Sequence, residues 1–136
     1  MPGATYVLDK TYKVTEAAGV GKYRAVIAGT NDGDCTLPTA ANQFSYGLTQ
    51  ESQVKQNENV VVRKYGISRA YAKGTVTKGD YVEVGDTAGG LRKADLSTVP
   101  GAATLHNVLG IAETSANDGE IFFVFLSPSP VVMPVS

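Results

Sequence analysis

The stretch from Val108 to Leu126 constrains the fold of this chain most strongly. Two apolar runs, Val108–Ala112 and Ile121–Leu126, flank a polar tract that contains Asn117-Asp118-Gly119. Asn, Asp and Gly are the residues that best tolerate the positive φ values of tight turns. The pattern therefore predicts two strands joined by a hairpin or by a longer β–β connection.

The second of these runs is apolar on both faces of the predicted strand. A strand with one face in water should alternate apolar and polar residues, and this one does not. Both faces therefore need cover, from the same barrel or from another subunit, because a bare apolar strand promotes aggregation. We expect a strand in the core or at a subunit contact, made of Ile121, Phe122, Phe123, Val124, Phe125 and Leu126.

The rest of the chain is typical of an all-β protein. Short alternating stretches such as Gln43–Thr49 and valine-rich ones such as Asn59–Tyr65 are separated by turns rich in Gly, Asn and Asp. No stretch shows the sustained periodicity of an amphipathic helix. We expect about eight to ten short strands that form a sandwich or barrel. A single β-barrel domain is expected over residues 16–126, which is long enough for a core.

Both ends of the chain are predicted to be extended. Residues 1–15 contain two short tyrosine-bearing stretches that indicate an N-terminal arm or edge strands, with Tyr6 and Tyr12. Residues 127–136 contain three prolines, which exclude a helix or a central strand and favour polyproline-like geometry. This tail leaves four apolar residues free to dock on a surface: Val131, Val132, Met133 and Val135.

The low charge content narrows the possible functions. Charged residues make up only 18% of the chain, below the usual quarter or so, and the formal net charge is −1. A basic footprint for DNA or RNA is absent from the sequence, so direct nucleic-acid binding is not expected. The first residues lack a charged-then-apolar pattern, so no secretion signal is expected, and no apolar run approaches the ~18 residues of a membrane span. The composition suits a protein that packs against neighbours in a cytoplasm-like compartment.

Residues for catalysis are sparse. Cys35 is the only cysteine and is expected to be a small, partly buried hydrophobic residue. His106 is the only histidine and falls in a predicted small-residue loop over residues 95–107. The sequence leaves a Cys–His pair open, although no activating motif flanks either residue. The expectation is a protein that is not an enzyme.

No cofactor or metal site is expected either. Gly19-Val20-Gly21-Lys22 lacks both the first glycine of a phosphate-binding loop and the hydroxyl residue that should follow its lysine. Asn31-Asp32-Gly33-Asp34 carries oxygens that could bind calcium, but a turn is the simpler interpretation. Glu83 is expected to face water, because its neighbours Val82 and Val84 carry the apolar alternation.

A series of short motifs stands in a fixed order between residues 59 and 126: Val62–Gly66, Lys78–Val82, Gly89–Ala94, Leu109–Ala116 and Gly119–Val124. This part of the chain resembles the capsid cement (head-decoration) proteins of tailed bacteriophages. In that family a Gly-Asp-x-Val turn, a small-residue loop and a Gly-Ile/Val-Ala strand precede a final apolar strand. The first 58 residues and the proline-bearing tail match no such pattern.

The resemblance implies a small β-barrel or β-tulip-like domain without catalytic residues. It also implies a homotrimer on the outer surface of the virion head, at threefold or quasi-threefold positions. There it would bridge subunits of the major capsid protein after synthesis in the host cytoplasm. Our hypothesis is that the 108–126 unit supports the trimer, whereas the capsid is contacted by Tyr6, Tyr12 or the tail residues Val131, Val132, Met133 and Val135.

Two other functions remain open at this stage. One is another β-rich virion protein, such as a tail or receptor-binding protein. The other is a β-barrel accessory domain of an enzyme that binds a small molecule or glycan. The accessory domain predicts a deep pocket with converging polar groups, whereas a cement protein predicts broad, flat contact surfaces.

Overall fold

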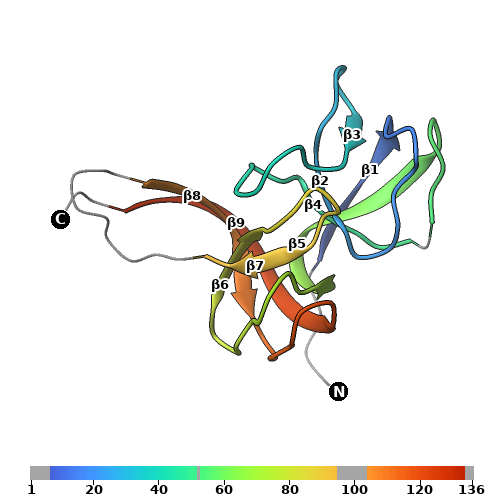
Figure 1. Ribbon diagram of the computed structural model, residues 1–136. Helices are drawn as coiled ribbons and strands as arrows, with labels where there is room; N and C mark the ends of the chain where they lie inside the picture. The colour runs from blue at the N-terminus through green and yellow to red at the C-terminus, as the bar shows by residue number, and fades with distance from the viewer. Residues whose placement is uncertain (1–6, 52, 95–103, 134–136) are drawn as a thin grey trace.

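The computed structural model describes residues 7–51, 53–94 and 104–133, and within these ranges the chain forms nine β-strands and no helix (Figure 1). The expected all-β class is thus confirmed. No helix that could cross a membrane occurs in the described residues. The strands are β1 Leu8–Val14, β2 Ala25–Ala28, β3 Asp34–Thr36, β4 Gly47–Thr49, β5 Asn59–Tyr71, β6 Tyr81–Val84, β7 Leu91–Lys93, β8 Thr104–Ala112 and β9 Ile121–Met133.

The first five strands close into a small barrel, which confirms the expected barrel class, although β1 lies outside the residues 16–126 expected to form it. β1 pairs with β3 in parallel, and β3–β2, β2–β4 and β4–β5 follow as antiparallel pairs. The pairing of β5 with β1 then returns to the start and closes the barrel. Closure leaves these strands with few unpaired edges. The interior is filled by buried residues from the strands and their connections: Tyr12, Val14, Val20, Val26, Cys35, Val54, Val60 and Val62.

The last strands form a second sheet against the barrel. Its order is β5–β9–β8–β6–β7, and all of its strand pairs are antiparallel. One face of this sheet contributes Val82, Leu91 and Phe122 to a second core, and Ala25 of β2 and Leu48 of β4 belong to the same cluster. The inner face of the sheet therefore packs on the outside of the barrel wall.

The long strand β5 belongs to both sheets, and it changes sheet at Gly66. Val60 pairs with Tyr12 of the barrel, whereas Ile67 pairs with Phe125 of the second sheet. Gly66 has φ = 107°, a backbone conformation that L side chains rarely adopt.

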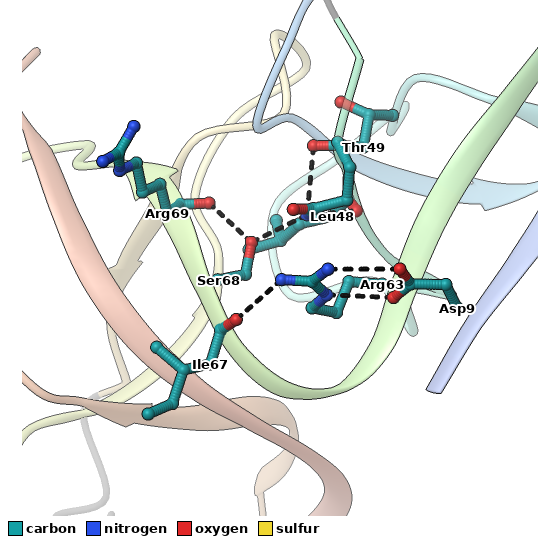
Figure 2. Close-up of polar contacts among 8 residues, drawn as sticks. Asp9, Leu48, Thr49, Arg63, Ile67, Ser68 and Arg69 are labelled. Atoms are coloured by element: carbon teal, nitrogen blue, oxygen red, sulfur yellow. Dashed lines mark hydrogen bonds and ion pairs between the residues drawn. The ribbon is translucent and has the colours of Figure 1, made fainter. Parts of the chain in front are cut away.

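Arg63 braces this bend of β5 (Figure 2). Its Nε and Nη2 donate to the two carboxylate oxygens of Asp9 in β1, at 2.9 and 3.1 Å, and its Nη1 donates to the carbonyl oxygen of Ile67 at 3.0 Å. A bidentate arginine–carboxylate pair fixes orientation as well as distance. Just beyond the bend, the buried hydroxyl of Ser68 accepts a hydrogen bond from Gln50 and donates to the carbonyl of Arg69.

The β5–β6 and β8–β9 connections are matched by a local twofold relationship. Gly79 N donates to Ala112 O at 2.8 Å, and Gly119 N donates to Ala72 O at the same distance. Val76 and Ala116 exchange two backbone hydrogen bonds between the loops. In each loop a carboxylate also accepts from a turn amide, Asp80 from Thr77 and Glu120 from Asn117. The predicted turn at Asn117-Asp118-Gly119 is confirmed as part of this paired structure, with Gly119 at φ = 82°.

The structure corrects the predictions made for the chain ends. An arm or edge strands were expected over residues 1–15; within the described part, residues 8–14 do form a strand, but β1 pairs with both β3 and β5 and is thus built into the barrel. The predicted proline-rich tail from residue 127 is instead the continuation of β9 to Met133, paired with β8 back to Thr104. Part of the loop expected over residues 95–107 is therefore strand as well. Prolines are tolerated in this segment because, within the described residues, it pairs with β8 on one side and the pairing of β9 with β5 ends at Leu126. In Figure 1 this hairpin extends away from the barrel, on the left of the view.

Gly110 should be essential for the junction between β8 and β9. A Cβ at this position would overlap the carbonyl oxygen of Phe125 on the paired strand. We expect Gly110→Ala to lower the free energy of unfolding by about 3 kcal/mol or more, measured by urea denaturation. Gly21→Ala is the matched control, because its Cβ would meet only ordinary contact with Gln53 at 3.8 Å. Equal stability of the two variants would contradict this role of Gly110.

Candidate interaction surface

The two faces of the apolar strand β9 have different surroundings. Phe122, Val124 and Leu126 are buried in the second core, with Phe122 only 1% exposed. The opposite face is open: Ile121 and Phe123 are 44% and 40% exposed. Both faces of this strand were expected to be covered. Within the described residues the chain covers one face and leaves the other exposed.

The open side of β9 belongs to an apolar row that crosses four strands in register. Tyr81 of β6 pairs with Ile111 of β8, Ile111 pairs with Phe125 of β9, and Phe125 pairs with Ile67 of β5. Residues directly opposite on neighbouring strands share a face of the sheet. The row and its neighbours form a surface that we call the outer face: Tyr65, Ile67, Tyr81, Ile111, Ile121, Phe123 and Phe125.

The outer face is ordered and of substantial size. The Tyr65 ring meets the Phe125 ring edge-on, with 5.4 Å between centroids. Six of its seven side chains are between 40% and 46% exposed, and Phe125 is half-buried. Large apolar side chains at this exposure sum to an apolar area on the order of 500 Å², near the upper end of what soluble monomers leave open. Contiguous patches of this kind mark interaction sites.

The hairpin that extends from the sheet is held at its base by a buried carboxylate. Glu83 is fully buried, which makes the expectation that it faces water wrong. Its Oε2 accepts from Arg92 Nε and Nη2 at 3.0 and 2.8 Å, and its Oε1 lies 2.8 Å from His106 Nδ1. Glu83 does point away from the core, as the alternation predicted, but Arg92 of β7 and His106 of β8 lie over it. A buried carboxylate requires such partners.

A second set of polar contacts joins the hairpin to the loop before β4. Asn42 Nδ2 donates to Leu105 O at 2.6 Å, and Asn107 donates to Asn42 through its backbone and its side-chain amide, both at 2.9 Å. The backbone N–H of Asn42 donates to Val84 O at 2.9 Å. Asn42 itself has φ = 61°, a conformation that asparagine tolerates better than most residues. These contacts fix the direction in which β8 leaves the sheet.

The structure does not bring the candidate catalytic residues together. Cys35 is buried in the barrel core, as expected, whereas His106 is bonded to Glu83 in the second sheet. Burial and the neighbouring Asp34 carboxylate raise the pKa of the Cys35 thiol to about 11. The thiol is therefore neutral at physiological pH and not a nucleophile. The segment Asn31–Asp34 forms a turn, as predicted, in which Asp34 N donates to Asn31 O at 3.1 Å.

The candidate capsid-contact residues fall in three different settings. Tyr12 is only 4% exposed and stacks on Tyr46 with 4.5 Å between ring centroids, so it has little surface to offer a partner. Tyr6 and Val135 lie outside the described residues. The remaining three, Val131, Val132 and Met133, lie in the outer part of β9, where they pair with His106, Leu105 and Thr104.

Four residues of the outer face, and Arg69 beside them, were not recognisable as a site from local patterns, although one signal in the sequence could have found some of them. Residues 72–84 and 112–124 share small, glycine and acidic positions at a constant offset, for example Ala72 with Ala112 and Gly79 with Gly119. This repeat places Tyr81 and Ile121 at equivalent positions. The missed residues are Tyr65, Ile67, Arg69 beside them, Tyr81 and Ile111.

A surface pocket of about 200 Å³ lies between the two matched loops. It is shallow and is lined by short side chains that include Thr75, Thr77, Ser115 and Asn117. Sites for small molecules usually measure about 300–1,000 Å³ and enclose most of the ligand. The broad outer face is thus the more prominent feature of the described surface.

Comparison with known proteins identifies a fold but no family. No protein-family model matches this chain, and neither does any curated protein. Among solved structures, the chain is similar to the N base of the head fiber protein gp8.5 of bacteriophage phi29, with a TM-score of 0.63 and 19% sequence identity. The match covers 93% of this chain and 98% of that one, so both the barrel and the second sheet take part in it.

The Cys35 thiol should be protected from chemical modification. Because its pKa is raised from 9.0 to about 11, we expect almost no reaction of the folded protein with an aromatic disulfide reagent at pH 8, and rapid reaction in urea. The same shift should make the folded state lose stability as pH rises from 9 to 11, since the unfolded thiol ionises first. Cys35→Ala should remove that part of the pH dependence, measured by denaturation. Fast labelling of the folded protein at pH 8 would contradict the assignment.

Proposed function

We propose that this protein is a non-enzymatic structural protein of a bacteriophage head. It binds the outer surface of the shell as a decoration (cement) protein, at threefold or quasi-threefold positions, and stabilises the shell by bridging major capsid protein subunits. The observation that carries the proposal is the exposed outer face, set on a fold that nearly the whole chain shares with the base of a phage head fiber.

The shape of the molecule supports a role in binding large partners. The outer face spans four strands of a braced sheet, and a stable protein–protein interface needs about 800 Å² from each partner. The outer face would supply much of that area, with its polar surroundings supplying the rest. Little ordering entropy is lost when a rigid sheet docks, which favours binding.

In this proposal two regions have different partners. The outer face, including Ile121 and Phe123 of the predicted trimer strand, joins copies of the chain into a homotrimer. The outer part of the β8–β9 hairpin, with Val131, Val132 and Met133, contacts the shell. The Glu83 and Asn42 contacts hold this hairpin at a fixed angle to the sheet. A trimer would present three such hairpins, and simultaneous contacts raise the overall affinity well above that of one.

The trimer proposal can be tested on the outer face. Because Ile111 and Phe123 are both about two-fifths exposed, replacing them by serine should cost the monomer little stability. We expect wild type to show a three-subunit mass by light scattering at micromolar concentration, and Ile111→Ser/Phe123→Ser a one-subunit mass. Phe44→Ser is the control, as Phe44 is exposed outside the outer face. A strictly monomeric wild type would rule out this trimer.

The shell contact can be tested by shortening the hairpin. Deleting residues 131–136 leaves the base of the hairpin and its Glu83 and Asn42 contacts in place. We expect at least tenfold weaker binding to expanded shells that lack this protein, measured by cosedimentation and imaging. Deletion of residues 1–6, which include Tyr6, is the comparison and should bind as wild type does. Unchanged binding after the C-terminal deletion would exclude the hairpin as the shell contact.

A further inference from the structure

One end of the outer face is bordered by cations that lie on aromatic rings. The guanidinium carbon of Arg69 is 5.4 Å from the ring centroid of Phe123 and 5.9 Å from that of Tyr23. Arg69 Nη1 also donates to the Tyr23 hydroxyl at 3.4 Å. We call this border the cationic edge, and it consists of Lys22, Tyr23, Arg24, Arg69, Tyr71 and Phe123.

The same arrangement continues on both sides of Arg69. The Lys22 ammonium lies 5.1 Å from the Tyr23 ring centroid. The guanidinium carbon of Arg24 lies 3.9 Å from the ring centroid of Tyr71. Tyr71 follows Arg69 by two positions on β5 and pairs with Ile121 of β9. Three cations from two distant segments are thus held together through aromatic rings at the end of the outer face.

The backbone at Tyr23 is in a conformation that this residue type avoids. Its φ is +60°, which costs free energy for an aromatic residue and is maintained only when surrounding contacts impose it. Thr49, which is fully buried, imposes it: Tyr23 N donates to Thr49 O at 2.8 Å, and Arg24 N donates to Thr49 Oγ1 at 3.0 Å. Strained residues of this kind cluster where a side chain must be aimed at a partner.

Among the described residues, the cations of this edge have no carboxylate partner. Within residues 7–51, 53–94 and 104–133, the ion pairs that form involve Arg63, Arg92 and His106, and none involves Lys22, Arg24 or Arg69. In a chain with 18% charged residues and a net charge of −1, three unpaired cations in one place are a local concentration of positive charge. Such a concentration attracts a negative partner and orients its approach.

The chemistry of the edge favours a protein as that partner. Arginine, tyrosine and phenylalanine are the residues enriched at the centres of protein interfaces. A guanidinium that lies near a ring can still use its other N–H groups for bidentate binding of a carboxylate. The edge is also continuous with the apolar outer face through Ile121 and Phe123. A nucleic acid would instead call for a longer basic track, and the net charge of the chain opposes it.

We propose that the cationic edge binds an acidic protein surface, in which carboxylates flank apolar side chains, on the shell that the protein decorates. The carboxylates pair with Arg24 and Arg69, and the apolar side chains meet the rings of Tyr23 and Tyr71 beside the trimer contact. The identity of the partner as the shell rests on the proposed function above, whereas recognition of carboxylates does not.

Charge reversal at the edge tests this proposal on shells. Arg24→Glu/Arg69→Glu should weaken binding to shells at least tenfold, and wild-type affinity should fall as salt is raised from 50 to about 300 mM. Lys55→Glu/Lys93→Glu makes the same change of charge at two exposed lysines away from the edge and should bind within about twofold of wild type. Arg69→Gln should give an intermediate loss. Unfolding midpoints of all variants, measured in parallel, identify any that fail to fold.

A shell-free titration separates this inference from the proposed function. Poly-L-glutamate should shift the amide NMR signals of Tyr23, Arg24 and Arg69 in the wild type, and not in the double arginine variant. If wild type fails to bind shells, the proposed function is wrong, and this titration still decides the edge. The inference is overturned if poly-L-glutamate leaves those signals unmoved or if both double variants lose shell binding equally. Tighter binding of a single-stranded thymidine oligonucleotide at the same residues would overturn it, as would loss of the trimer in the arginine variant.

Discussion

The structure depends on one strand that serves two sheets. β5 closes the barrel with its first half and forms the edge of the second sheet with its last part, so its backbone must turn at Gly66. Arg63 holds the turn by bonding across it to Ile67 and sideways to Asp9. Because both cores are built against this strand, the bend sets the position of the second sheet on the barrel wall. It thereby decides which face of that sheet remains in solvent.

The outer face of the second sheet is the face that the barrel leaves uncovered. β9 is apolar on both sides, but the barrel can cover only the side that packs on it. The matched loops between β5 and β6 and between β8 and β9 then bring Tyr81 beside Ile111 and Ile121 beside Tyr71, which extends the apolar character across the sheet. The cost of leaving such a surface in water is offset when a partner covers it. A structural protein of a phage head, bound to its own copies and to the shell, provides that cover in our proposal.

Much of the fold could be predicted from local patterns. The turn at Asn117-Asp118-Gly119, the valine-rich strand from Asn59 and the apolar strand from Ile121 were all recognisable, because turn residues and period-two alternation act over a few residues. The site was harder to predict. Glu83 was expected in water because its own strand alternates, yet Arg92 and His106 cover it. Residues 127–133 were expected to be unpaired because of their prolines, yet β8 offers them a partner on one side.

The sequence by itself determined that the chain is all-β, that it has few charges to steer ligands, and that its last strand carries more apolar surface than one core can use. Only the tertiary structure decided where that excess lies. The alternation of residues along a strand specifies which side chains share a face of the sheet. Whether that face is buried depends on segments that are distant in the chain. Tyr23 and Arg24 reach Arg69 and Tyr71 only because β2, β4 and β5 are neighbours in the closed barrel. Long-range strand pairing, which no local pattern encodes, therefore built both the outer face and its cationic edge.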